Sequence, residues 1–188
     1  MKNPSVISHQ LSVFRKLFRI ATCALLAAYC LMIAAYAQGD ELPKDAAPPP
    51  LKIVSKDERK SLDAETNAKK RTQLSLNLME IRLKAAEDFA AQNKYQESIN
   101  ELGVFQGLLE DVLKYLERKD DGGGKADDNY KRLEIGLRKT GPRLELVRRE
   151  LPFRYGFYVQ QIQKFVREAR AKAIEPLFDD TVVPERKP

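Results

Sequence analysis

Histidine and cysteine, the side chains on which many active sites and metal centres depend, are almost absent from this sequence. The chain of 188 residues has one histidine, His9, two cysteines, Cys23 and Cys30, and no tryptophan. These residues all fall within the first 37 positions. For the rest of the chain, their absence excludes cysteine nucleophiles, Ser-His-Asp triads and the usual zinc, di-iron and haem ligand sets. We therefore predict no metal and no cofactor.

The first 37 residues also lack negative charge: they contain four basic residues and no acidic residue. The run IATCALLAAYCLMIAAY at residues 20–36 is uncharged, and Ala35 and Ala37 are small residues at the positions that a signal peptidase reads. The pattern predicts a signal peptide over residues 1–37, cleaved after Ala37, in a protein that is periplasmic or secreted. The alternative is an N-terminal membrane anchor, because residues 20–36 reach the lower limit of roughly 17–25 residues for a spanning helix.

Beyond residue 37 the charge is nearly balanced and the prolines are concentrated near the start. The net charge falls from +6 to about +2, since only four of the 33 basic residues and none of the 27 acidic residues lie before it. Three consecutive prolines end at Pro50 and favour a stiff, non-helical segment. We predict a Pro-rich linker over residues 38–54, a helical domain over 55–176 and a loose C-terminal tail over 177–188.

No segment shows a confident strand, and apolar residues recur at helical spacing through the predicted domain. Ser55 and Glu58 have the spacing of a capping box, and the helix that follows is predicted to run unbroken to about Asn93. Further helices are predicted over about 94–119, 126–151 and 152–176, with a glycine-rich loop at 120–128 and a kink at Gly141-Pro142. The predicted fold class is all-α, a four-helix bundle-like array of antiparallel helices without a sheet.

The first predicted helix is long and carries apolar residues on two opposite sides. One stripe is formed by Leu76, Met79, Leu83, Ala86 and Ala90, and the other by Leu74, Leu78, Ile81, Ala85 and Phe89. A surface helix needs only one such stripe, so this helix either lies between neighbours or packs on a partner chain. The candidate partner-facing residues are Leu74, Leu78, Ile81 and Phe89.

The stretch AAEDFAAQNKYQESINEL at residues 85–102 resembles one helical hairpin of the tetratricopeptide family. Ala86, Phe89, Tyr95 and Leu102 lie near the spacing that this family favours. One period later, the positions that match Ala86 and Phe89 fall in the glycine loop, so the resemblance covers one unit and not a repeat array. The layout of the chain also resembles uncharacterised exported helical proteins of bacteria, a likeness that implies no activity.

Residues 131–154 form a basic window with eight basic and three acidic residues. Each acid lies four residues before an arginine, the favoured order for ion pairs on a helix surface, although the third pair crosses Pro152. The pairs are Glu134–Arg138, Glu145–Arg149 and Glu150–Arg154. Two interpretations stay open: a solvated face of the domain, or an anion-binding rim formed by Arg148, Arg154, Tyr155 and Tyr158.

These patterns predict a protein that is not an enzyme and that acts by protein–protein interaction in the periplasm or cell envelope. The partner would be an unknown protein or a second copy of the chain, and nucleic acid is excluded as a partner outside the cytoplasm. The alternative is a binding module for anionic envelope surfaces or polymers through the Arg/Tyr rim, in peripheral contact with them. Weak cation binding beside the glycine loop also stays open, at Asp120, Asp121, Asp127 and Asp128.

Overall fold

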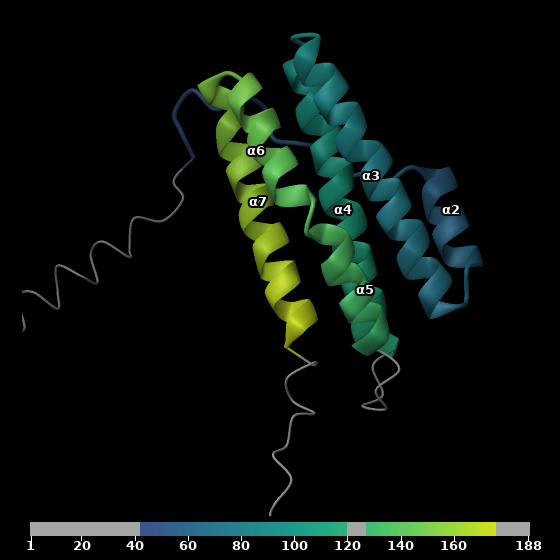
Figure 1. The fold of residues 1–188 in the computed structure, drawn as a ribbon. Coiled ribbons are helices and arrows are strands. Elements are labelled where there is room, and N and C mark those ends of the chain that lie inside the picture. Colours follow the sequence, from purple (N-terminus) through teal and green to yellow (C-terminus); the bar gives the residue numbers. More distant parts are fainter. Residues whose placement is uncertain (1–41, 120–126, 176–188) are drawn as a thin grey trace, which may run out of the picture. The chain divides into compact units, whose positions relative to one another are not determined.

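The computed structural model describes residues 42–119 and 127–175, which form six helices and no strand. The helices are α2 (Lys56–Ala64), α3 (Ala68–Ala91), α4 (Tyr95–Lys119), α5 (Asp127–Leu137), α6 (Thr140–Glu150) and α7 (Phe153–Ile174), as Figure 1 shows. The predicted all-α class is confirmed for these residues. The predicted signal peptide, residues 120–126 of the glycine loop and the predicted tail 177–188 lie outside the described residues.

The first predicted helix is two helices in the structure, because the chain leaves the helical conformation over residues 65–67. Its start is confirmed as a capping box: the Glu58 N–H donates to Ser55 Oγ (3.2 Å), and the Ser55 N–H donates to the Glu58 carboxylate (3.0 Å). The unbroken course is wrong, because Asn67 starts a new helix by accepting a hydrogen bond from the Lys70 N–H (3.1 Å). The spacing of apolar residues does not reveal such a cap, because the cap is a hydrogen bond between the polar side chain of Asn67 and a backbone N–H.

Helices α3 and α4 form an antiparallel hairpin around a tight turn at residues 92–94. Asn93 has φ 60°, in the left-handed region that asparagine enters more readily than most residues. The Ser98 hydroxyl in α4 donates to the Ala86 carbonyl in α3 (2.8 Å), which satisfies a buried polar group at the closed end of the hairpin.

Helices α5 and α6 replace the third predicted helix, whose kink was expected at Gly141-Pro142. The interruption lies instead at Arg138 and Lys139, and α6 begins at Thr140. A proline ring clashes with the carbonyl four residues earlier, which here belongs to Arg138, so the first helix ends there. Pro142 consequently lies in the first turn of α6, where its missing N–H is not needed. The predicted kink is therefore a break, placed about one turn upstream.

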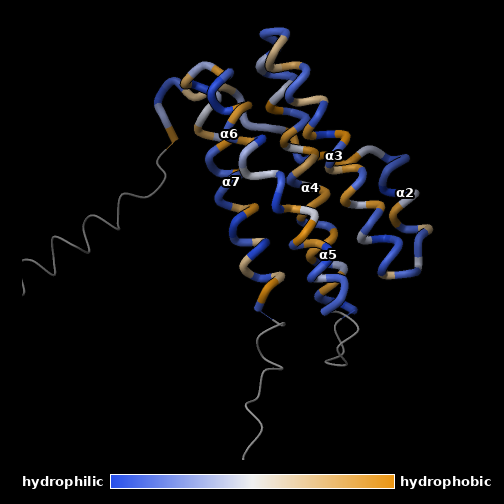
Figure 2. Tube along the Cα trace, viewed as in Figure 1, coloured by the Kyte–Doolittle hydropathy of each residue, from blue (hydrophilic) through white to orange (hydrophobic). Residues whose placement is uncertain are grey.

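The apolar stripe that crosses this break is buried on both sides of it. All six members are at most 7% exposed: Leu133, Leu137, Thr140, Leu144, Val147 and Leu151. The two short helices thus act as two segments of one arm, joined by a shared buried face. Figure 2 shows hydrophobic and hydrophilic stretches alternating along the long helices, while α2 is mainly hydrophilic. Across the described ranges, no helix has both the length and the apolar character needed to cross a bilayer.

The long elements pack as two antiparallel pairs, α3 with α4 and the α5–α6 arm with α7. Two ion pairs set the direction of the first: Arg71 in α3 meets Asp111 in α4, whereas Arg82, later in α3, meets the earlier Glu101. Two contacts show that the second pair is antiparallel as well: Glu134–Arg170 and Glu145–Gln163. Each pair reverses direction within a short loop, as expected for neighbours in sequence.

The two pairs also lie against each other, with α3 beside the α5–α6 arm and α4 beside α7. Leu76 and Glu80 of α3 lie next to Gly136 and Arg143 respectively, so α3 and the arm run in the same direction. Lining residues shared by α4 and α7 advance together in the same way, from residues 106 and 157 to residues 117 and 172. The domain therefore has two interfaces between parallel helices, which we call the α3–α5 side and the α4–α7 side.

A non-helical segment, Ala47–Val54, which we call the strap, lies along the α4–α7 side and leads into α2. The Ala47 N–H donates to the Arg154 carbonyl (3.0 Å), and the Tyr158 hydroxyl donates to the Ala47 carbonyl (2.6 Å). Ala47 and Val54 are 2% and 7% exposed. The second half of the predicted linker 38–54 is therefore packed on the helical domain and does not serve as a free spacer.

Two glycines in the middle of α4 provide the space for the strap. A Cβ on Gly103 would lie 2.6 Å from the carbonyl oxygen of Leu51, and a Cβ on Gly107 would lie 3.0 Å from that of Lys52. Glycine inside a helix costs about 0.5–1 kcal/mol relative to alanine. The close approach of the strap backbone is the physical reason for both glycines.

Candidate functional site

The four residues of the predicted anion-binding rim are engaged to different degrees. Arg148 makes two hydrogen bonds of 2.8 Å to Glu145, and this pairing raises the pKa of Arg148 above its usual value. Tyr158 is buried and its hydroxyl is bonded to the strap. Arg154 is exposed, with its guanidinium carbon 5.5 Å from the centre of the Tyr155 ring. Arg154 remains accessible, and Tyr155 is half-buried, with its ring centre 5.9 Å from that of Tyr95. Arg148 and Tyr158 have partners inside the domain.

The four predicted partner-facing residues of α3 differ in exposure. Three are half-buried: Leu74, Leu78 and Phe89. Leu74 and Leu78 pack against the core, and the Lys94 ammonium lies 5.8 Å from the centre of the Phe89 ring. Ile81 is 61% exposed. The side of α3 that carries these residues therefore offers a single large apolar side chain, Ile81, to a partner.

Acids within the domain bind several bases of the basic window. Two of the three predicted pairs are confirmed: Glu134–Arg138 and Glu145–Arg149. The third is wrong, since no hydrogen bond or ion pair joins Glu150 to Arg154 in the described part of the chain. The helix ends between these two residues, so they are no longer one helical turn apart.

Glu134 shows how completely an acid of this region can be enclosed. It is 3% exposed and accepts from Arg138 (2.8 Å) and from Arg170 of α7 (2.8 Å). Hydrogen bonds from Arg138 and then Arg170 lower the pKa of Glu134 below its usual value. The carboxylate therefore links α5 to α7 in its ionised form.

Arg143 forms a contact between distant parts of the sequence that helical spacing does not predict. Its guanidinium binds both oxygens of Glu87 in α3 (2.6 and 2.7 Å) and one oxygen of Glu80 (2.6 Å). Hydrogen bonding to Glu87 is the main cause that raises the pKa of Arg143. A forked pair of this kind fixes geometry as well as charge, so Arg143 positions α6 on α3.

Four bases of the window have no carboxylate within 4 Å among the described residues: Lys131, Arg132, Lys139 and Arg154. Arg132 donates to the side-chain oxygen of Asn129 (3.1 Å). The first three of these bases line one groove on the α3–α5 side. Within the basic window, three of the four bases without a carboxylate partner in the described residues therefore lie in one groove.

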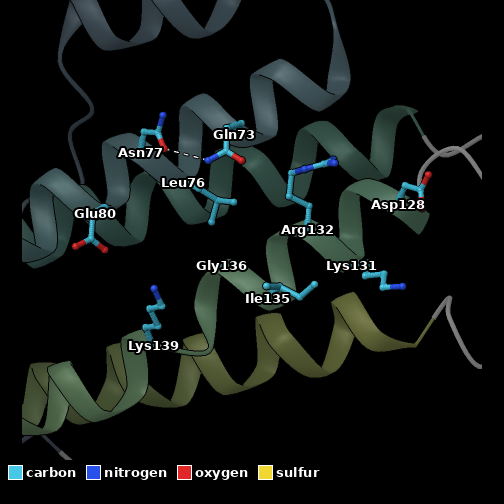
Figure 3. A pocket seen from close by; sticks show the side chains of 10 residues that line it. All are labelled: Gln73, Leu76, Asn77, Glu80, Asp128, Lys131, Arg132, Ile135, Gly136 and Lys139. Carbon is cyan, nitrogen blue, oxygen red and sulfur yellow. Dashed lines mark hydrogen bonds between the residues drawn. The ribbon is translucent and has the colours of Figure 1, made fainter.

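The groove lies between α3 and α5 and has a volume of about 740 Å³. Figure 3 shows Glu80 and Lys139 at one end and Asp128 and Lys131 at the other. Its lining comprises Gln73, Leu76, Asn77, Glu80, Asp128, Lys131, Arg132, Ile135, Gly136 and Lys139. The α3–α5 groove is the candidate functional site, because it brings polar, apolar and basic groups together at one concave surface.

Leu76 and Gly136 form the floor of the groove, where α3 and α5 approach closely. A Cβ on Gly136 would overlap the end of the Leu76 side chain. Figure 3 shows Leu76 pointing from α3 toward α5. Ile135 is 50% exposed beside this floor, so the centre of the groove is apolar while its two ends are charged.

The described residues offer little for redox or metal chemistry. No group of three His, Cys, Asp or Glu side chains within residues 42–119 and 127–175 is placed to hold a metal ion. Asp120 and Asp121, half of the acids considered for cation binding, lie outside those ranges. The groove can therefore recognise a ligand by hydrogen bonds, charge and a small apolar contact.

The two amide side chains of α3 that line the groove, Gln73 and Asn77, were not singled out from the sequence. They are one turn apart, and the Gln73 amide nitrogen donates to the Asn77 side-chain oxygen (3.0 Å). That spacing indicates a shared face, but it does not say what lies opposite. Only the placement of α5 beside α3 turns these amides into one wall of a site.

Comparison of the chain with protein-family models, with curated proteins and with solved structures finds no match.

Proposed function

We propose that this protein is an exported, non-enzymatic helical protein that binds a segment of a partner protein in the α3–α5 groove. The observation that carries the proposal is the gathering in that groove of bases without carboxylate partners, beside amide groups and an exposed Ile135. Export rests on the pattern of residues 1–37, a basic start followed by an uncharged run and a small-residue cleavage site.

The proposal includes a finer interpretation of the fold, a four-helix bundle-like domain whose arms are α3, α4, α5–α6 and α7. Parallel neighbours across two stacked hairpins support it, as does the likeness of residues 85–102 to a tetratricopeptide hairpin. In this interpretation, the apolar stripe of α3 that includes Met79 and Leu83 faces the α5–α6 arm. The stripe that includes Leu74 and Leu78 is half-covered, which leaves Ile81 for a partner.

A non-enzymatic role is supported by how the acids of the domain are used. Glu80 and Glu87 are bound by Arg143, and Glu58 and Glu101 are bound by Arg82. A carboxylate that accepts hydrogen bonds from an arginine inside the domain is not positioned to exchange a proton with a substrate. These pairs hold helices together, and they leave recognition as the role of the groove.

Site-specific crosslinking tests the proposed function, because residues 38–188 contain no cysteine. In a full-length chain with Cys23 and Cys30 changed to Ser, Asn77→Cys would be labelled with a photo-crosslinker. Gln160→Cys, at an exposed position of α7, serves as the matched control. After exposure to an envelope extract, we expect a discrete protein adduct from position 77 that Lys131→Glu abolishes.

Two results would count against the proposed function. One is an identical adduct from position 160, which would indicate contact without a preferred surface. The other is the absence of any adduct from position 77 under conditions in which the labelled protein is folded by circular dichroism. An adduct whose mass corresponds to two copies of the chain would identify the partner as the protein itself.

A further inference from the structure

We infer that the α3–α5 groove recognises an extended acidic segment in which an acidic residue, an apolar residue and a second acidic residue occupy alternate positions. The inference rests on the proposed function, because it names the chemistry of the segment that docks in the same groove. Its basis is the match between two distances, one on the protein and one on an extended chain, together with the order of basic and apolar groups along the groove.

The distance on the protein comes from Lys131 and Ile135, which lie four residues apart in α5 and line the same groove. A helix rises 1.5 Å per residue, so four residues separate side chains by roughly 6 Å along its axis. Lys139 lies in the break beyond the end of α5 and lines the other end of the groove (Figure 3). An extended chain places alternate side chains on one side at intervals of roughly 6.6 Å. The first two of three alternate residues of such a chain therefore match Lys131 and Ile135 in spacing, and the third continues toward the end of the groove that Lys139 lines.

The charges at the two ends favour acids in the first and third places. Lys131 and Arg132 together lie at one end and Lys139 at the other, and the lining has three bases against two acids. Glu80, the acid beside Lys139, is already bound by Arg143 (2.6 Å). Asp128 lies in the first turn of α5, where the helix dipole stabilises negative charge. The two acids thus have favourable partners of their own, whereas Lys131 and Lys139 have no carboxylate partner within residues 42–119 and 127–175.

The α3 wall supplies groups for the backbone of the segment. The Gln73 amide nitrogen is bonded to Asn77, which leaves the Gln73 carbonyl oxygen and the Asn77 amide nitrogen directed to other partners. Both side chains are exposed. One is an acceptor for a peptide N–H and the other a donor for a peptide carbonyl, the pair that an extended backbone presents.

The concave shape favours a polypeptide over a membrane surface. The apolar floor at Leu76 and Gly136 lies between two helices, and a flat bilayer cannot reach it while contacting both walls. An extended chain is narrow enough to do so. Ile135 beside the floor then receives the central apolar side chain.

Fluorescence anisotropy with labelled peptides tests the inference on the purified full-length protein. The probe carries glutamate, serine, leucine, serine and glutamate between flanking glycines. We expect saturable binding that weakens as salt rises. Lys131→Glu with Lys139→Glu should weaken it at least tenfold. The matched control, Lys56→Glu with Lys60→Glu on α2, makes the same charge change on a helix whose packing partner is α3, and it should change binding less than twofold.

A second peptide tests the alternation itself. It has the same composition with the two glutamates adjacent, and we expect at least fivefold weaker binding. Equal binding of both peptides would overturn the spacing. Ile135→Ser should weaken the first peptide and leave the second nearly unchanged, because only the first places its leucine between the two lysines.

The remaining outcomes separate this inference from the proposed function. If neither peptide binds but the groove adduct from position 77 still forms, the acidic segment is wrong and the proposed function stands. If both experiments are negative, both proposals fail. Binding to phosphatidylglycerol vesicles that is lost in the Lys131→Glu, Lys139→Glu variant, without peptide binding, would overturn the inference in favour of a lipid surface. Circular dichroism of each variant confirms that loss of binding is not loss of folding.

Discussion

The two interfaces between parallel helices, the α4–α7 side and the α3–α5 side, differ in what lies on them. On the α4–α7 side, the strap lies over Gly103 and Gly107 and is held by the buried hydroxyl of Tyr158. On the α3–α5 side, a groove of about 740 Å³ has Lys131 and Lys139 without carboxylate partners in the described part of the chain. The strap packs on the α4–α7 side, where smaller grooves of about 540 and 310 Å³ remain, and the α3–α5 side has the larger groove.

The glycines of the two sides show the same contrast. Gly103 faces a backbone carbonyl of the strap, which cannot move without losing the strap's anchors. Gly136 faces the end of the Leu76 side chain, which can change rotamer. The α4–α7 side is thus built around a fixed main chain, and the α3–α5 side around adaptable side chains.

The largest effect should come from filling the space beneath the strap. Gly103→Ala places a Cβ 2.6 Å from the Leu51 carbonyl oxygen, and we expect a loss of about 2–3 kcal/mol in the free energy of unfolding. Gly136→Ala is the matched variant and should cost less than about 1 kcal/mol, because Leu76 can give way. Urea unfolding of both proteins measures the difference, and equal losses would break the contrast between the two sides.

Replacing an acid inside the domain should lower the free energy of unfolding more than replacing a base in the groove. Glu134→Gln removes the ionised partner of Arg138 and Arg170, and we expect a loss of about 2 kcal/mol at pH 7. The folded-state pKa of Glu134 is lowered, so its contribution is present above the unfolded value of about 4.3 and disappears as pH falls through the lower folded value.

Urea unfolding at pH 7, 4 and 3 checks this pH dependence. The stability of the natural protein should fall more steeply with acidification than that of the Glu134→Gln variant. Parallel curves for the two proteins would show that the acid between α5 and α7 is not the source of the acid sensitivity.

The anchor of the strap should have an intermediate effect. Tyr158→Phe removes the hydrogen bond to the Ala47 carbonyl (2.6 Å) while keeping the ring, and we expect a loss of about 1 kcal/mol. Hydrogen exchange should accelerate at the Ala47 amide and along the strap, with little change in the α3–α5 groove. Unchanged exchange at the strap would mean that its packing on α4 and the hydrogen bond from the Ala47 N–H to the Arg154 carbonyl are enough to hold it.

The smallest effect on stability should come from the groove bases. Lys131→Gln with Lys139→Gln removes two charges that have no carboxylate within 4 Å among the described residues, and we expect a change within about 0.5 kcal/mol. Thermal unfolding measures this. A loss of 2 kcal/mol would show that the lysines serve the fold and would remove the main argument for a ligand site.

Local features could be predicted from the sequence, because they depend on the spacing of nearby residues alone. The capping box at Ser55, the buried stripe from Leu133 to Leu151 and the Glu145–Arg149 pair each involve residues within a few turns of one another. The position of the break before Pro142 was missed by one turn, since the clash acts on the carbonyl four residues earlier.

Features between helices could not be predicted, because they depend on which elements become neighbours. The contact of Arg143 with Glu87 joins residues 56 positions apart, and no local pattern marks it. Gly103 and Gly107 are glycines one turn apart inside a helix, a pattern that indicates a close packing partner. The partner is the strap, which the composition of the sequence predicts to be part of a linker. The groove forms only where α3 and α5 lie side by side. Nothing in the sequence around Gln73 and Asn77 predicts that α5 lies opposite them.

The most direct measurement of the central contrast is a nuclear magnetic resonance titration of the protein with the alternating acidic peptide. We expect chemical-shift changes in the backbone amides of the α3–α5 groove, at Gln73, Asn77, Lys131, Ile135 and Lys139. We expect none along the strap or in Gly103 and Gly107. Shifts centred on the strap and the α4–α7 side, with the α3–α5 groove unchanged, would contradict the proposal that the α3–α5 groove binds the peptide.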